Sequence, residues 1–136
     1  MEKSWQGDPF GDHLGLKIVS MAGGKAELSL LIEHHHLNAV RIVHGGVVYS
    51  LMDHAMGAAL MSHLREGQIC ATLEIKINYL NATRRGSLTA KAKVIDKKRH
   101  IAVLQGEIRN GATLVAQAIG TFYIFLHGAE KIKALI

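Results

Sequence analysis

One continuous apolar run constrains the fold of this chain more than any other feature. It begins at His44-Gly45-Gly46 and continues for about 18 residues, without proline or a glycine-rich break, to near Leu64. Its apolar residues would lie on nearly every side of a helix: Val47, Val48, Leu51, Met52, Ala55, Met56, Ala58, Ala59, Leu60 and Met61. A helix that is hydrophobic almost all round is a buried helix, and at this length it belongs inside a protein. The rest of the chain must therefore surround it.

The segments on either side of this run are typical of strands. Residues 16–32 are apolar and β-prone with a break at Gly23-Gly24, which predicts a hairpin or a bent strand. Alternation with a period of two over residues 72–79 predicts two strand faces. These faces carry Leu73, Ile75, Ile77 and Tyr79 on one side and Thr72, Glu74, Lys76 and Asn78 on the other. Three further strands are expected at 88–95, 102–109 and 114–125, with hairpin-like connections at 81–86, 96–100 and 110–111.

These elements predict one α+β domain over residues 1–136. A buried helix and about five mostly antiparallel strands combine most simply as a curved sheet wrapped around the helix. The core is expected to extend from about residue 14 to residue 126, with short extensions at both ends.

Composition excludes several classes of protein. With 49% hydrophobic and 20% charged residues, the chain is globular rather than disordered. The chain has no stretch of about 18 uncharged apolar residues, so no membrane span is expected. The first residues lack the apolar run of a signal peptide. The single Cys70 rules out an internal disulfide and suits a reducing compartment, so we expect a cytoplasmic protein.

The net charge of +5 has a simple and a more specific interpretation. The simple one is solubility, and the specific one is an anionic partner. Only 5% of residues are aromatic, and no basic stretch alternates with aromatic residues as a base-stacking platform would. Nucleic acid is therefore a poorer candidate partner than a small ligand that carries phosphates.

Asp53 is the anomaly of the buried helix. It lies among Leu51, Met52, Ala55 and Met56, where an ionised carboxylate is rarely buried without a partner. It either faces a solvent-filled crack, pairs with a basic side chain, or takes part in catalysis.

The start of the same helix is a second candidate site. A helix N-terminus presents unpaired amides with a positive partial charge, and glycine lets a ligand approach the backbone closely. Gly45-Gly46 could therefore hold an oxyanion, or could simply make a sharp turn into the helix. Asn38 and His44 add two side-chain donors, which either polarise the same carbonyl or cap the helix.

The two candidate sites are too far apart to serve one reaction within one helix. Asp53 lies eight residues beyond Gly45, or about 12 Å along the helix axis. A general base must come within about 3 Å of a water that sits beside the polarised carbonyl. If both groups are catalytic, Asp53 must reach the Gly45 end of a second chain's helix. A two-fold homodimer would provide this arrangement twice.

Asn38, His44-Gly45-Gly46 and Asp53, with this spacing and layout, resemble the motif of the hotdog-fold thioesterases of the PaaI type. The resemblance extends from about Leu14 to Phe125. Two departures are Arg41, where members commonly carry glycine, and Tyr79-Leu80-Asn81, which lacks a common proline. The resemblance implies a curved antiparallel sheet around one long helix, hydrolysis of an acyl-CoA thioester, and a dimer of dimers.

The resemblance also implies a role for each matching residue. The Gly45 amide would polarise the thioester carbonyl, assisted by Asn38 and His44. Asp53 of the partner would activate water or attack directly, and Thr72 would orient the water unless it is an ordinary strand threonine. No metal or cofactor is expected, since coenzyme A enters as part of the substrate.

The remaining polar clusters are less specific. Arg84 and Arg85, with Gly46, are candidate substrate-binding residues because guanidinium groups suit the phosphates of coenzyme A. Residues 97–99 are basic and can equally be a solvated hairpin tip. The run 34–36 is all histidine but lacks metal-ligand spacing, so a polar loop is expected there. Two rival functions remain open: a non-catalytic acyl-CoA-binding sensor and a hotdog hydratase or dehydratase.

Overall fold

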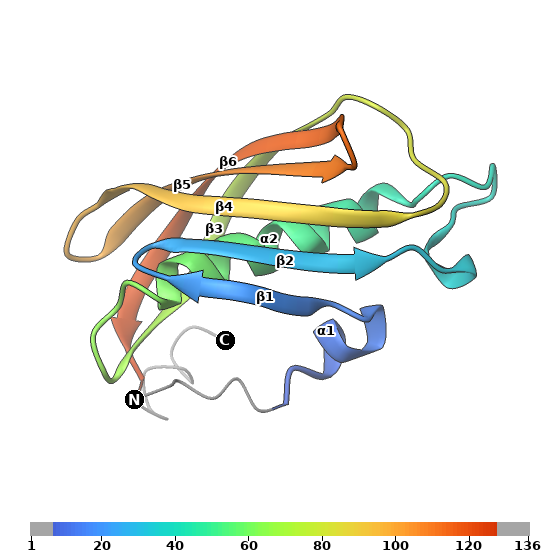
Figure 1. Cartoon of the computed structure of the whole chain (residues 1–136). Helices are drawn as coiled ribbons and strands as arrows, with labels where there is room; N and C mark the ends of the chain where they lie inside the picture. The colour runs from blue at the N-terminus through green and yellow to red at the C-terminus, as the bar shows by residue number, and fades with distance from the viewer. Residues whose placement is uncertain (1–6, 128–136) are drawn as a thin grey trace.

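A six-stranded antiparallel sheet curves around one long helix in the computed structural model, which describes residues 7–127 (Figure 1). Two short helical elements, α1 and the 3-10 helix η1, complete the fold. In chain order the elements are α1 (Pro9–Leu14), β1 (Lys17–Ala22), β2 (Lys25–Leu31), η1 (His34–His36), α2 (Gly45–Met61), β3 (Gln68–Tyr79), β4 (Ser87–Lys97), β5 (Ile101–Asn110) and β6 (Thr113–Leu126). The sheet order is β1-β2-β4-β5-β6-β3. The predicted α+β architecture is confirmed, with six strands because the first hairpin supplies two.

The buried helix forms where the apolar run predicts it. All ten predicted apolar residues of α2 are buried, and the helix packs against the inner face of the sheet. The approach is close at two sheet glycines: a Cβ added to Gly106 or Gly120 would lie 2.5 Å or 2.8 Å from the sulfur of Met52 or Met56. A side chain at either position would force the methionine to move, so these glycines allow α2 and its methionines to pack closely against the sheet.

The predicted alternation in β3 fails at one residue. Thr72 pairs with Phe122 and Glu74 with Thr121, so Leu73 is an extra, bulged residue. The extra residue reverses which side chains face the helix on either side of the bulge. Thr72 therefore lies on the helix-facing side of β3 together with Ile75, whereas Leu73 is 58% exposed. The prediction placed both Leu73 and Thr72 on the wrong faces, because a bulge has no period-two signature.

The predicted connection at 81–86 is not a hairpin. Strands β3 and β4 are not neighbours in the sheet, so this segment crosses from the β3 edge to the middle of the sheet. On its way it passes the start of α2, where the Val43 N–H donates to the Thr83 carbonyl at 2.8 Å. The predicted hairpins at 23–24, 96–100 and 110–111 are confirmed by the pairing of their flanking strands.

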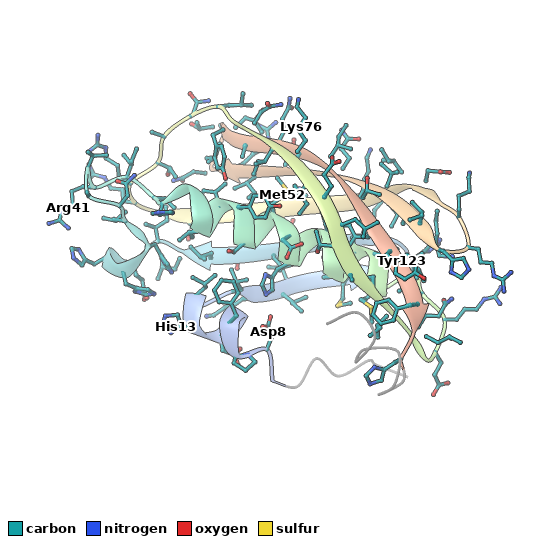
Figure 2. The ribbon with its side chains drawn as sticks, turned by 180° about the vertical axis from the view of Figure 1, so that it is seen from behind. Asp8, His13, Arg41, Met52, Lys76 and Tyr123 are labelled. Carbon is teal, nitrogen blue, oxygen red and sulfur yellow. The ribbon has the colours of Figure 1, made fainter. Side chains whose placement is uncertain are left out.

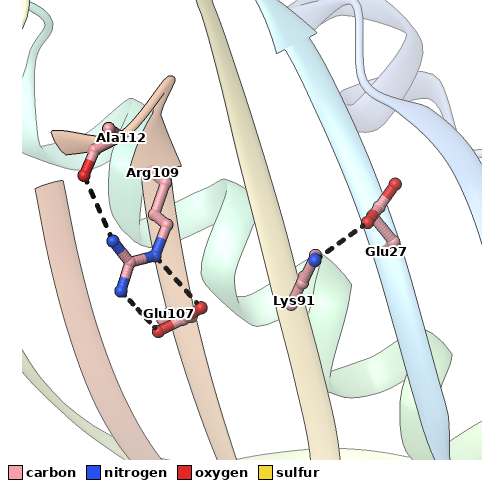
Figure 3. Close-up of polar contacts among 5 residues, drawn as sticks. All are labelled: Glu27, Lys91, Glu107, Arg109 and Ala112. Atoms are coloured by element: carbon pink, nitrogen blue, oxygen red, sulfur yellow. Dashed lines mark hydrogen bonds and ion pairs between the residues drawn. The ribbon is translucent and has the colours of Figure 1, made fainter. Parts of the chain in front are cut away.

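The face of the sheet away from α2 is solvated and charged. Lys91 pairs with Glu27 at 3.7 Å, and Arg109 bonds Glu107 and the Ala112 carbonyl (Figure 3). A hollow of about 740 Å³ on this face is lined by strand residues that include Lys25, Lys76 and Lys93. Within residues 7–127, no helix is both long enough and apolar enough to span a membrane.

Candidate active site

Asp53 lies on the narrow polar stripe of α2, half-buried, and faces β3. The Thr72 hydroxyl donates to Asp53 Oδ1 at 2.6 Å. The bulge at Leu73 makes this contact possible, because without it Thr72 would point away from the helix. No basic side chain among the described residues pairs with Asp53. The carboxylate is therefore oriented by a hydroxyl through one oxygen, and the second oxygen is left for another donor such as water.

The start of α2 is capped by its own histidine. The Gly46 N–H donates to His44 Nδ1 at 2.8 Å, which makes His44 the N-cap residue. A ring nitrogen that accepts must be unprotonated, so the proton of a neutral imidazole lies on Nε2. His44 thus caps the helix, and its Nε2–H can still donate to another group.

The Gly45 amide differs from that of Gly46. Within residues 7–127, the Gly45 N–H donates no hydrogen bond. The first turn of α2 therefore presents a backbone donor to whatever occupies the space beyond the helix end, as an oxyanion-binding N-terminus requires.

Asn38 closes the loop that leads to this helix. Its Oδ1 accepts from the Val40 and Ile42 amides at 3.1 and 3.2 Å. The Nδ2 group has no acceptor in the described part of the chain and can donate to a ligand. Arg41 takes φ +64°, a left-handed conformation that favours glycine. The loop thus keeps a glycine-like turn in spite of the arginine, which lies at one end of the molecule in Figure 2.

Tyr79 contacts the start of α2, although the sequence interpretation gave it no role in the site. Its hydroxyl donates to the Gly45 carbonyl at 3.0 Å. Its ring lies 3.5 Å from the place where a Gly45 side chain would begin. Burial, and then the nearby Tyr49, raise the pKa of Tyr79 above its usual value, so the phenol keeps its proton and can donate. The available signal was an aromatic residue at the last helix-facing position of β3.

The structure therefore forms two half-sites on one helix. Thr72 lies at Asp53, whereas His44 and Tyr79 lie at Gly45. The two groups stand about 12 Å apart along α2, because eight residues separate Asp53 from Gly45. Within one chain they are not brought together.

Arg84 and Arg85 lie on the same side of the molecule as the Gly45 half-site. They are exposed on the crossover between β3 and β4. Val43 bonds this crossover at Thr83, and Asn110 bonds it at Thr83 and Arg85. No acidic side chain of the described residues pairs with either arginine. The basic residues 97–99 lie at the β4–β5 hairpin, at the opposite end of β4 from Arg84 and Arg85. Lys98 pairs there with Asp96.

The histidine run is a structural element rather than the predicted loop. It forms η1, and His36 is buried between the Glu33 amide at 2.9 Å and the Leu14 carbonyl at 2.8 Å. Within residues 7–127 no three His, Cys, Asp or Glu side chains are grouped to hold a metal ion. His54, next to Asp53, turns away from the site and bonds Asp8 at 2.7 Å.

The sheet around one helix and the paired polar groups on that helix define the class of this protein. The model of the thioesterase superfamily matches residues 41–117, and the chain belongs to this family. It is similar to the E. coli PaaI protein from the phenylacetic acid degradation operon, with a TM-score of 0.82, 28% identity and coverage of 91% of this chain and 88% of that one.

Two further similarities are informative. A conserved protein of Pseudomonas aeruginosa shares 37% identity with a TM-score of 0.83, over 86% of this chain and 94% of that chain. A human protein named acyl-coenzyme A thioesterase 13 is 28% identical over 112 residues, which cover 80% of this chain and 79% of its own length. The chain is thus an enzyme of the hotdog thioesterase type, similar to the PaaI branch.

Proposed function

We propose that this protein hydrolyses an acyl-CoA thioester to a free acid and coenzyme A. The observation that carries the proposal is the pair of half-sites on α2. At its start is a Gly45 amide without a bond to any described residue, and in its middle is a Thr72-bonded Asp53 carboxylate. The similarity to a human acyl-coenzyme A thioesterase supports coenzyme A as the thiol component.

In the proposed reaction the thioester carbonyl oxygen accepts from the Gly45 N–H, with Asn38 Nδ2 and His44 Nε2 as further donors. These groups are strongest when charge develops on that oxygen. Asp53 takes a proton from a water that attacks the carbonyl carbon. The carbon–sulfur bond then breaks, and the departing thiolate takes the proton from Asp53. Neither step needs a metal or a redox cofactor.

Asp53 could instead attack directly and form a mixed anhydride, which water then hydrolyses. A single turnover in ¹⁸O-labelled water detects an anhydride that water opens at the Asp53 carbonyl, because the label then enters the Asp53 carboxylate. An anhydride opened at its acyl carbonyl and the general-base route both label the free acid, so chemical trapping of the anhydride separates these two.

The proposal requires a homodimer in which Asp53 of one chain serves Gly45 of the other. Support comes from β3, which among the described residues 7–127 pairs with β6 alone and so has one unpaired edge. Thr72 and Tyr79 show that β3 runs antiparallel to α2. A partner strand paired antiparallel along that edge would carry its own α2 in the opposite direction, with its Asp53 towards Gly45. We further propose a dimer of dimers that acts in the cytoplasm, as the family resemblance and the single Cys70 suggest.

We propose that coenzyme A lies with its phosphates at Arg84 and Arg85 and its thioester beside Gly45 and Gly46. The crossover that carries the arginines is bonded to Val43, one residue before the N-cap of α2. Guanidinium groups without acidic partners are suited to a pyrophosphate or a 3′-phosphate.

The experiment measures thiol release from acetyl-, medium-chain, phenylacetyl- and hydroxybenzoyl-CoA by the wild type and Asp53→Asn. The loss of a general base lowers kcat by about two to four orders of magnitude. Asp96→Asn is the matched control, because Asp96 is an exposed carboxylate on the β4–β5 hairpin. If the wild type binds these substrates without releasing thiol, or if Asp53→Asn is as fast, the proposal fails.

A further inference from the structure

The peptide between Gly45 and Gly46 is held at both of its ends. Its carbonyl accepts from the Tyr79 hydroxyl at 3.0 Å, and its N–H donates to His44 Nδ1 at 2.8 Å. The two contacts come from different elements, since Tyr79 is the last residue of β3 and His44 caps α2. The peptide plane is therefore fixed from two directions.

Holding this peptide in place is useful because it joins two glycines. Glycine has more backbone conformations than any other residue, so the first turn of α2 is where this helix can most easily change its dihedral angles. The Gly45 N–H belongs to the preceding His44–Gly45 peptide, which joins the Gly45–Gly46 peptide at the Gly45 Cα. A shift of the Gly45–Gly46 peptide moves this Cα and so changes the aim of the N–H beside it. An oxyanion donor stabilises a transition state only if it is already aimed at the developing charge.

We propose that Tyr79 is a positioning residue for thioester hydrolysis, which holds the Gly45–Gly46 peptide so that the Gly45 N–H points at the thioester oxygen. This inference rests on the function proposed above. Tyr79 acts through the backbone, as its hydroxyl is already engaged with the Gly45 carbonyl. Its ring, 3.5 Å from the Gly45 position, covers the side of the turn where a side chain would project.

Tyr79→Phe is the decisive variant because it removes the hydroxyl and keeps the ring. The expected result is a fall in kcat of about five- to tenfold, as for one neutral hydrogen bond, with KM unchanged within about twofold. A donor aimed at the transition state affects kcat rather than ground-state binding. Tyr123→Phe is the control, because Tyr123 lies at the other end of the molecule from Arg41 (Figure 2).

A second measurement does not depend on turnover. Amide hydrogen exchange at Gly46 should be at least about threefold faster in Tyr79→Phe than in the wild type, because the Gly45 carbonyl then loses its bond to β3. An unchanged Gly46 exchange rate, or an unchanged kcat with only a lower Tm, would overturn the inference. If the wild type releases no thiol from any acyl-CoA, the proposed function fails, and the exchange rates still test whether Tyr79 holds the peptide.

Discussion

Replacing Arg41 with glycine should make the protein more stable. Arg41 has φ +64°, where a residue with a Cβ pays about 1–2 kcal/mol relative to the right-handed region. Glycine avoids this cost but loses about 0.5–1 kcal/mol through its greater freedom in the unfolded chain. The net gain is about 0.5–1 kcal/mol. For 136 residues the entropy of unfolding is about 0.29 kcal/mol/K, so Tm should rise by about 2–4 °C.

Thermal unfolding followed by calorimetry tests this prediction. Protein concentration must be the same for all variants, because association makes Tm depend on concentration. Arg41→Ala is the control, since it removes the same charge and side chain but keeps a Cβ at a left-handed position. The reasoning would be refuted if Arg41→Gly melts at or below the temperature of Arg41→Ala.

Three further predictions concern the site and its surroundings. Thr72→Val should lower kcat for thiol release about tenfold, since a hydrogen bond to a carboxylate at an exposed position is worth about 1.5 kcal/mol; an unchanged kcat would show that Thr72 does not orient Asp53. Replacing both Arg84 and Arg85 with serine should raise KM for acyl-CoA about tenfold and leave KM for the matching acyl-pantetheine unchanged, and an equal rise for both would contradict phosphate binding. Burial raises the pKa of Asp8, but hydrogen bonds from Gly11 and His54 outweigh it and hold that pKa below its ordinary value. The charge of Asp8 therefore stabilises the fold above about pH 4 and stops doing so as the pH falls further. Asp8→Asn keeps a helix cap and should lower Tm by about 1–3 °C at pH 6, a small shift because Asp8 is partly exposed, and by progressively less as the pH falls below about 4. A shift that does not shrink with falling pH would exclude the charge as the cause.

The burial of α2 could be predicted because it depends only on the identity of its own residues. A run that is apolar on all sides has no stable exposed state as a helix, whatever surrounds it. The strand faces at 88–94 and 102–108 were predicted correctly for the same reason, since alternation is local.

The errors arise where long-range pairing decides the structure. The bulge at Leu73 depends on how β3 aligns with β6, and nothing in residues 72–79 marks it. The crossover at 81–86 contains turn-forming residues that a hairpin would also use, so only the sheet order distinguishes the two.

For the candidate site, the sequence predicted residues but not their contacts. The motif singled out Asp53, Gly45 and His44 as candidates, whereas the hydrogen bond from Thr72 to Asp53 depends on the unpredicted bulge. Tyr79 lies 34 residues from Gly45, and its bond to the Gly45 carbonyl has no local signature. An aromatic residue at the end of a strand is more often a packing residue than a positioning one.

Each proposed active site combines Gly45 of one chain with Asp53 of the other. Gly45→Pro removes the amide hydrogen, and proline is suited to the first position of a helix that follows a residue with ψ 135°. Gly45→Ala, which keeps the N–H and adds a Cβ at ordinary contact distance from Tyr79, controls for bulk.

Heterodimers of Asp53→Asn and Gly45→Pro chains, purified with two different tags, test that claim. If the sites are shared, one site of the heterodimer combines the intact Gly45 of the Asp53→Asn chain with the intact Asp53 of the Gly45→Pro chain. The other site has lost both groups. The heterodimer should therefore release thiol at about half the wild-type rate per dimer, while each parent homodimer is at least about 100-fold slower. A heterodimer as inactive as its parents would contradict the shared site.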